Sequence, residues 1–410
     1  MTSSTVLQAW AGRSLLSALL FSSLLVGCVS RIREPEAPEP FVFRALDLRQ
    51  QSGKGEPAWD LTSPEARYDL VRQLAQARRP HGVIYRHAKP HITVSALRGT
   101  VIGDGEAIQL EGDVRITLLG KNPVLIGGDQ ARWLPGQNLM VIDRRPSASD
   151  RRSRISAQQA RYLLTEDRVE LRGAPLLEQW STPQALQGER KPAPIRVHAV
   201  TVDWKPQQGE LVATGEVLGE RFAQGRHQRG RAGADAADLQ LTASGLRGNL
   251  RREFIDLLEP VRLRDRSGST WLHARQTRWD LQQQTLTSAL PFTGARQQLQ
   301  ASGDALRLDL AAETVLVPHA CRLAQPGEEL TAERCLWHWP SGRFQANGQV
   351  QLRRSAYKQL TRSAQLEGRI GKSGEAVFSS PAARVQSRFT LPPKGPQRQT
   401  AKASKPPVVF

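Results

Sequence analysis

Residues 330–352 read LTAERCLWHWPSGRFQANGQVQL, and the spacing of their apolar residues indicates the fold. Its apolar and small residues recur at every second position in three runs, which are Leu330 and Ala332, then Cys335, Trp337 and Trp339, and then Phe344, Ala346, Gly348, Val350 and Leu352. A period of two is typical of a β-strand with one buried face. Turn residues at positions 340–342 separate the last two runs, so the stretch predicts a β-hairpin with one apolar face.

One step in this stretch breaks the period. The spacing between Ala332 and Cys335 is three instead of two, and the same jump occurs from Ala157 to Ala160. We interpret the extra residue as a β-bulge, because two residues of a bulged strand oppose one residue of its partner and the apolar face is restored.

The hairpin pattern repeats along the chain. Five clear copies align on a small residue, at Ala96, Ala157, Ala199, Ala274 and Ala332, and weaker copies begin at Gly128, Ala243 and Ala301. Most of the five clear copies have an aromatic residue five places on, a glycine sixteen places on and an apolar residue eighteen places on. About eight tandem hairpins with one apolar face each must fold these faces together, which predicts an all-β protein.

One segment near the N-terminus is predicted to be a short helix. Ser63 is a suitable N-cap for residues 64–79, which begin with a proline. Leu70, Val71 and Leu74 then give this helix an apolar stripe.

The N-terminus predicts export. Arg13 precedes an apolar run over residues 15–26, and a cysteine, Cys28, follows Val26-Gly27. This order is that of a bacterial lipoprotein signal, in which residues 1–27 are removed and Cys28 is lipidated. The alternative, an uncleaved membrane helix, needs about 20 apolar residues, and the run is shorter.

The composition is strongly basic, with a formal net charge of +18. Export argues against nucleic acid as the partner, and the basic residues are scattered rather than clustered among aromatic residues. The charge therefore favours an anionic partner, such as a phosphorylated lipid headgroup, an acidic glycan or the membrane surface, and the alternative is that it serves only solubility.

No catalytic or metal motif is visible, so we expect no enzyme and no cofactor. Acidic pairs such as Glu166-Asp167 fall in predicted turns, where we expect them to be solvated. Apart from Cys28, the cysteines are Cys321 and Cys335, and the sequence leaves open whether they form a disulfide. His319 and His338 lie near them, but the spacing fits known zinc sites poorly.

The inner positions of the repeats favour a groove. They are mostly Ala, Gly, Val and Leu, and the chain has only 10 Phe and two Met. A groove of this kind would bind acyl chains, at about 0.8 kcal/mol for each buried methylene, whereas the alternative is an ordinary core. The candidate groove residues are Val94, Ala96, Val101, Leu110, Val114, Tyr162, Leu171, Val202, Trp204, Leu211, Val217, Leu257, Val261, Trp279, Leu286, Phe292, Trp337, Phe344 and Val350.

The repeat Ala-x4-[Trp/Tyr]-x10-Gly-x-Val resembles the OstA-like fold of the lipopolysaccharide transport bridge. Trp59-Asp60-Leu61, Tyr68, Gly82-Val83-Ile84-Tyr85 and Ala96 are similar to the start of LptC in its long, cyanobacterial form. The resemblance covers residues 55–380. Two features depart from the familiar LptC, which has a transmembrane helix and one short domain: here the anchor is Cys28, and the repeats suffice for two or three domains.

The resemblance implies an elongated, twisted, open β-jellyroll. It covers two jellyroll regions (55–220 and 221–380). The residues themselves predict the signal (1–27), a lipidated Pro/Glu-rich linker (28–54) and a basic disordered tail (381–410).

The resemblance also implies a periplasmic protein linked to the inner membrane, where the predicted lipidation of Cys28 would anchor it. It would accept lipopolysaccharide from an ABC transporter and pass it to an OstA-like jellyroll, LptA or the N-terminal domain of LptD, through paired edge strands. Two alternatives are an envelope β-helix that binds or cleaves acidic polysaccharide and a passive envelope scaffold that binds acidic glycan.

Overall fold

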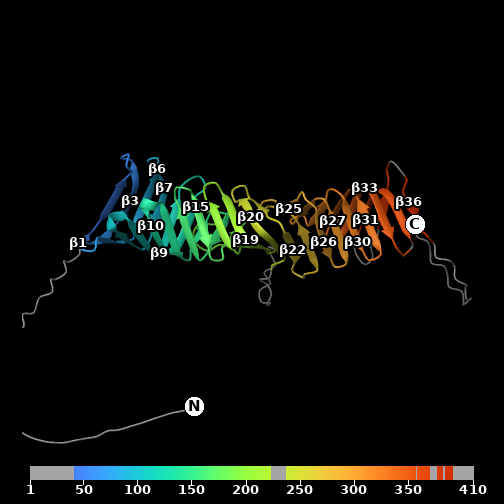
Figure 1. The fold of residues 1–410 in the computed structure, drawn as a ribbon, viewed down its shortest axis with the longest axis horizontal. Helices are drawn as coiled ribbons and strands as arrows, with labels where there is room; N and C mark the ends of the chain where they lie inside the picture. Colours follow the sequence, from blue (N-terminus) through green and yellow to red (C-terminus); the bar gives the residue numbers. More distant parts are fainter. Residues whose placement is uncertain (1–40, 223–236, 357, 370–375, 382–383, 391–410) are drawn as a thin grey trace, which may run out of the picture. The chain divides into compact units, whose positions relative to one another are not determined.

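The computed structural model describes residues 41–222, 237–356, 358–369, 376–381 and 384–390, all within the unit Pro40–Phe410. The predicted signal peptide, Cys28 and most of the predicted tail lie outside these residues. Within them are 36 strands and two short 3-10 turns, η1 (Gly103–Gly105) and η2 (Pro135–Gln137), and every strand pair is antiparallel (Figure 1). The predicted all-β jellyroll is confirmed, and the described pairs do not form the parallel rungs of a β-helix.

The strands form one sheet that is folded along its length into two walls. Wall 1 is the ladder β1 (Phe41–Phe43), β4 (Glu65–Asp69), β5 (Leu74–Arg78), β8 (Arg98–Ile102), β9 (Ala107–Leu118), β10 (Val124–Leu134), β11 (Leu139–Arg144), β14 (Gln159–Leu163), β15 (Arg168–Arg172), β18 (Thr201–Lys205), β19 (Glu210–Arg221), β20 (Leu239–Asn249), β21 (Phe254–Leu257), β24 (Thr277–Asp280), β25 (Thr285–Ser288), β28 (Leu306–Asp309), β29 (Thr314–Val317), β32 (Arg334–His338), β33 (Arg343–Arg354), β34 (Gln359–Arg369) and β35 (Ala376–Ser379).

Wall 2 contains the strands that alternate with these along the chain, and it shares the six longest strands with wall 1. Its ladder is β2 (Leu46–Gln51), β3 (Pro57–Ser63), β6 (His81–Arg86), β7 (Lys89–Ser95), β9, β10, β12 (Ser147–Ser149), β13 (Ser153–Ser156), β16 (Leu176–Gln179), β17 (Ile195–His198), β19, β20, β22 (Val261–Asp265), β23 (Thr270–Ala274), β26 (Phe292–Arg296), β27 (Leu299–Gly303), β30 (Cys321–Gln325), β31 (Glu328–Ala332), β33, β34 and β36 (Gln386–Arg388).

The repeat motif marks the corners where the chain crosses between the walls. Ala332 ends β31 in wall 2, and Arg334 begins β32 in wall 1. The predicted bulge at this position is therefore wrong: the extra residue, Glu333, turns the corner, so that the inner residues of both walls still face each other. The next strand crosses back at Gly348, whose φ is +78°, and a Cβ there would collide with the Glu333 side chain. Only glycine suits both this backbone conformation and this close approach.

The predicted helix over residues 64–79 is wrong. This segment forms the hairpin β4–β5, which pairs with β1 on one side and β8 on the other. Leu70 and Val71, which suggested an apolar helical stripe, are exposed in the turn between the two strands. The ladder hydrogen bonds offered by the neighbouring strands override the local helical pattern.

The same segment is a further copy of the repeat that the sequence did not reveal. Tyr68 lies five places after Ser63, and Arg79, with φ at +49°, lies sixteen places after it. Ser63 Oγ, expected to cap a helix, instead lies 2.7 Å from the main-chain oxygens of both Glu65 and Arg78, and its single O–H donates to one or the other of them at the corner.

The boundaries of the regions need one correction. β1 and β2 lie in the predicted linker over residues 28–54, so the sheet begins before residue 55. The proposed boundary at 220/221 falls at the end of β19, which pairs with β20 through ten residues, so the sheet is continuous across it.

The close packing around Gly128, at a corner of the sheet, can be tested by substitution. A Cβ at this position would lie 2.5 Å from Ile142 Cγ2 and 2.8 Å from the Arg144 carbonyl oxygen. We expect Gly128→Ala to lower the free energy of unfolding by about 1–3 kcal/mol, because the main chain must shift to relieve the overlap. Gly136→Ala is the matched control, since nothing lies within 4 Å of its added Cβ. Equal denaturation midpoints for the two variants would contradict the close approach.

Candidate functional site

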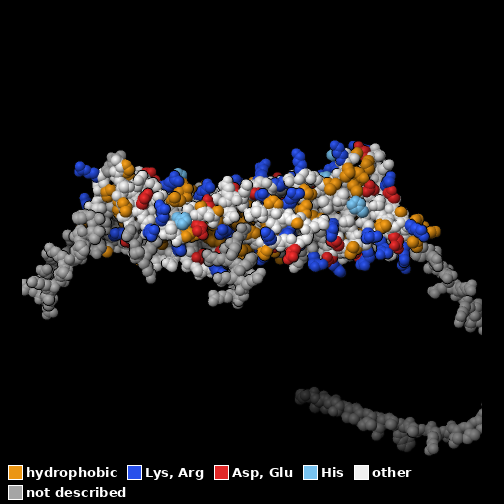
Figure 2. All heavy atoms as spheres, turned by 180° about the vertical axis from the view of Figure 1, so that it is seen from behind, with side chains coloured by type: hydrophobic (Ala, Val, Ile, Leu, Met, Phe, Trp, Pro, Cys, Tyr) orange, Lys and Arg blue, Asp and Glu red, His pale blue; other side chains and the backbone are white. Residues whose placement is uncertain are grey.

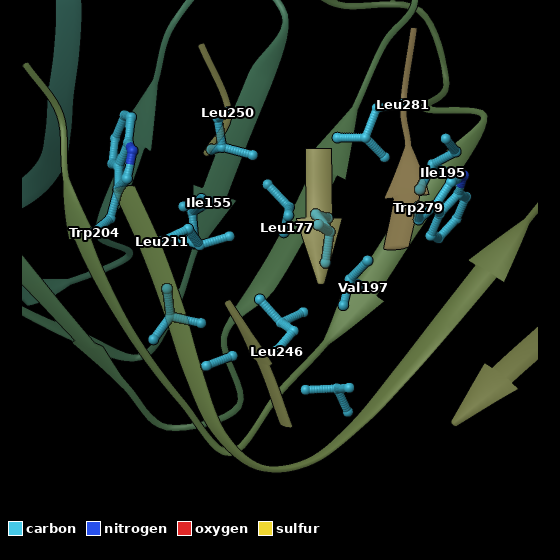
Figure 3. Close-up of a cluster of buried hydrophobic side chains, with 14 of the residues drawn as sticks. Ile155, Leu177, Ile195, Val197, Trp204, Leu211, Leu246, Leu250, Trp279 and Leu281 are labelled. Carbon is cyan, nitrogen blue, oxygen red and sulfur yellow. The ribbon is translucent and has the colours of Figure 1, made fainter. Parts of the chain in front are cut away.

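All nineteen candidate groove residues lie between the two walls. Eighteen are buried and Trp337 is half-buried, and together they belong to one continuous apolar cluster. Figure 3 shows the middle of this cluster, where Ile155, Leu177 and Val197 from wall 2 and Leu211 and Leu246 from wall 1 share one interior. Sequence periodicity thus placed these side chains correctly on the inner face.

The interior is filled in the N-terminal part. Residues of large volume there have no exposed surface, namely Ile92, Ile108, Ile116, Ile126, Met140, Ile142, Ile155 and Tyr162. The small number of Phe and Met in the chain predicted an unfilled groove, but isoleucines fill this part instead. Protein interiors pack to crystal-like density, and in this region a ligand would have to separate the walls.

The C-terminal part contains an apolar cavity of about 100 Å³ between the walls. Leu272 and Leu323 line it from wall 2, and Leu308, Val315 and Trp337 line it from wall 1. This volume is below the roughly 300–1,000 Å³ of ordinary ligand pockets, so the cavity needs to widen before it holds an acyl chain.

A disulfide connects the walls beside this cavity. Cys321 of β30 in wall 2 is bonded to Cys335 of β32 in wall 1, and Cys335 also lines the cavity. With their sulfur atoms joined, neither cysteine is a zinc ligand.

Opposite the corners, the turns of wall 1 face the turns of wall 2 along an edge that we call the mouth. The main chain crosses between the walls at the corners, but across the mouth the contacts are made by side chains. Four arginines of wall 2, the mouth arginines, reach turns of wall 1. Arg86 Nη2 donates to Leu164 O at 2.7 Å, Arg152 forms an ion pair with Glu253, Arg221 Nη2 donates to Leu310 O at 3.5 Å, and Arg296 Nη1 donates to Trp339 O at 3.3 Å.

A buried polar cluster closes the mouth of the N-terminal part. Asp167, expected to be solvated, is only 6% exposed, so that expectation was wrong. Its carboxylate accepts hydrogen bonds from Tyr162 Oη at 3.2 Å and from the main-chain nitrogen of Gln207 at 2.9 Å. The Gln207 side chain in wall 1 then contacts His91 Nε2 in wall 2 at 3.0 Å. The cluster therefore joins the two walls next to Arg86.

Burial shifts the protonation equilibria of this cluster. Loss of hydration lowers the pKa of His91, and the positive charge of Arg86 lowers it further, while Asp167 raises it. Burial also raises the pKa of Asp167 above 3.8, against the hydrogen bonds from Gln207 and Tyr162. Burial likewise raises the pKa of Tyr162. In the folded protein at neutral pH, His91 is therefore neutral and is held as a hydrogen-bonding partner.

We expect acid to weaken this closure through His91. Because folding depresses the pKa of His91, its contribution to stability is full above pH 6.5 and is lost as pH falls through the folded-state pKa. Protonation of Asp167 has the opposite effect on stability and occurs at lower pH. Because folding raises the pKa of Asp167, its protonation favours the folded state near and below pH 4. Urea denaturation from pH 8 to pH 5 should show a smaller loss of stability in His91→Gln than in the unmodified chain. Parallel curves for the two proteins would refute this role of His91.

The outer faces of the walls are charged but mixed in sign. Figure 2 shows Lys and Arg side chains along the face in view, interspersed with Asp and Glu. Cross-strand ion pairs such as Arg278–Asp256, at 2.6 Å, are partly exposed and each contributes little to stability. Among the described residues, no helix has the length and apolar character to cross a membrane, and no three His, Cys, Asp or Glu side chains group as metal ligands.

Comparisons with known proteins give one family match. Residues 18–174 match the model described as "Lipopolysaccharide-assembly, LptC-related". No curated protein matches the chain. A similar solved structure is that of LptH from Pseudomonas aeruginosa, the LptA homologous periplasmic component of the lipopolysaccharide transport device. It shares 11% identity over 32% of this chain and 90% of that chain, with a TM-score of 0.24.

Proposed function

We propose, from the premise that residues 18–174 are LptC-related, that this chain is a periplasmic carrier of lipopolysaccharide. It accepts the lipid from an inner-membrane ABC transporter into the space between the walls and passes it toward the outer membrane. The observation that carries the proposal is the apolar cavity under the mouth, between Leu308 of wall 1 and Leu323 of wall 2. It is a carrier and not an enzyme.

The fold suits a carrier because the mouth is held by weaker contacts than the corners. In the C-terminal part, opening the mouth breaks the hydrogen bonds of Arg221 and Arg296 to main-chain oxygens of wall 1, each worth about 0.5–1.5 kcal/mol, and leaves the sheet ladders intact. Each methylene that then enters the interior contributes about 0.8 kcal/mol. A few methylenes therefore offset the loss of these hydrogen bonds.

The ends of the sheet are suited to joining other jellyrolls. At one end, β1 and β2 each pair on one side only within the described residues, and Phe41, Val42 and Phe43 of β1 are exposed. At the other end, β35 and β36 are the edges, with Val377 and Phe389 exposed. Exposed apolar edge strands pair readily with a further strand. We propose that an OstA-like jellyroll, LptA or the N-terminal domain of LptD, pairs with one of these ends.

We propose further that lipidated Cys28 anchors the chain to the inner membrane. Cys28 precedes the described residues by a short spacer, and β1 begins at residue 41. This order would place the N-terminal edge of the sheet near the membrane and the C-terminal edge away from it.

Native mass spectrometry tests the proposed cargo. We expect the purified chain to retain lipopolysaccharide, and not to retain the same polysaccharide after removal of its lipid part. Binding of the delipidated polysaccharide instead would favour the alternative of an envelope glycan-binding protein. No binding of either molecule would refute the carrier.

A further inference from the structure

Tryptophans of the inner face carry buried hydrogen-bond donors without acceptors. The indole Nε1 atoms of Trp204, Trp279 and Trp337 have no partner in the described structure. Trp204 and Trp279 are only 1% and 3% exposed. An indole N–H can only donate, and a buried donor without an acceptor is unfavourable. These groups therefore favour a ligand that brings an acceptor into the interior.

Two of these tryptophans lie beside a mouth arginine and a cavity. Trp279 and Arg221 line a cavity of about 230 Å³, together with Phe222 and Leu310. Trp337 and Arg296 line the apolar cavity of about 100 Å³, and the Arg296 guanidinium carbon lies 5.4 Å from the Trp337 ring centroid. A mouth arginine, an indole N–H without an acceptor and a cavity thus occur together twice along the interior.

Both arginines are held weakly in the closed mouth. Arg221 and Arg296 donate to neutral main-chain oxygens at 3.5 and 3.3 Å, which are long for hydrogen bonds. Arg152, by contrast, forms an ion pair with Glu253. A guanidinium binds a phosphate by two parallel, charge-assisted hydrogen bonds that are far stronger than one long bond to a carbonyl. A phosphate can therefore displace the wall 1 carbonyl.

We propose that Arg221–Trp279 and Arg296–Trp337 are two equivalent binding stations for a phosphorylated acyl lipid. At each station the arginine takes the phosphate, the indole N–H donates to the carbonyl oxygen that links an acyl chain to the headgroup, and the cavity receives the chain. Binding of the phosphate releases the arginine from wall 1, so the charged headgroup itself opens the mouth. This inference rests on the proposed carrier function and names the groups of the lipid that the carrier recognises, which are the phosphate and the acyl carbonyl.

The test compares lipids with and without phosphate. Lipopolysaccharide, enzymatically dephosphorylated lipopolysaccharide and phosphatidylglycerol are titrated against the unmodified chain and the double variant Arg221→Gln/Arg296→Gln. We expect the double variant to bind the phosphorylated lipids at least tenfold more weakly, equivalent to 1.4 kcal/mol, with little change for the dephosphorylated lipid. Arg307→Gln, an exposed arginine of β28, is the matched control and should bind all three like the unmodified chain.

Two further variants are conservative replacements, so that a change in lipid binding does not simply reflect a loss of folding. Arg296→Lys retains the charge but not the planar pair of donors, and we expect an intermediate loss for phosphorylated lipids. Trp337→Phe removes the N–H, and we expect it to weaken the binding of all acylated lipids, whereas Trp133→Phe in the filled N-terminal part should not.

The outcomes separate this inference from the carrier proposal. Equal affinity losses for phosphorylated and dephosphorylated lipopolysaccharide, or no loss at all in the double variant, would overturn the stations while the unmodified chain still binds lipid. Failure of the unmodified chain to bind any lipid would remove the carrier function itself.

Discussion

Replacing Ala301 by leucine is expected to stabilise the fold and at the same time to block lipid binding at the Arg296–Trp337 station. Ala301 of β27 is half-buried and lines the apolar cavity of about 100 Å³. The larger side chain fills this space, and we expect the free energy of unfolding to rise by about 1 kcal/mol, since each buried methylene contributes about 0.8 kcal/mol and some strain is added. The space for the acyl chain at the Arg296–Trp337 station is lost, so binding at this station should fall at least tenfold, while the Arg221–Trp279 station is unchanged.

Gln300→Leu is the matched control for this substitution. Gln300 is the preceding residue of the same strand and is exposed on the outer face. The same leucine there should leave lipid binding unchanged. Lipid binding by Ala301→Leu at the level of the unmodified chain would mean that the ligand does not enter this cavity.

Removing the disulfide is expected to cause the largest loss of stability. Cys321 and Cys335 are 14 residues apart in sequence and are bonded across the two walls. Cross-linking a loop of about 15 residues stabilises a protein by roughly 3 kcal/mol, mainly by restricting the unfolded chain. We expect Cys321→Ala/Cys335→Ala to lower the free energy of unfolding by about this amount in chemical denaturation.

A reductant provides the control for the disulfide. The unmodified chain should lose a similar amount of stability when it is fully reduced, whereas the double alanine variant should not respond to reductant. A loss below about 1 kcal/mol in both experiments would show that the bond does not constrain the unfolded chain.

The inner face could be predicted from the sequence, but the corners could not. A period of two places Trp337 and Phe344 on one face whatever the strands pair with, and the structure agrees. The jump after Ala332, however, fits a bulge as well as a corner, because both absorb one extra residue. The difference depends on the pairing partners of β31 and β32. β31 pairs with β30 in wall 2, whereas β32 pairs with β29 in wall 1.

The contacts of the mouth arginines could not be predicted from the sequence. Arg86, Arg152, Arg221 and Arg296 contact residues 78, 101, 89 and 43 positions away. They are four of the many arginines of a basic chain, and only the folded sheet brings their partners near. The filled N-terminal interior was missed for another reason: its isoleucines, such as Ile108 and Ile142, were visible, but the small count of Phe and Met in the whole chain concealed their local concentration.

Photo-crosslinking at adjacent residues of one strand tests the central claim, that an acyl lipid occupies the space between the walls. A photo-reactive amino acid at Leu308 points into the cavity, whereas the same residue at Arg307 points outward from β28. With radiolabelled lipopolysaccharide present, we predict strong labelling at position 308 and background labelling at position 307. Equal labelling at the two positions, or labelling at 307 alone, would contradict a lipid held between the walls.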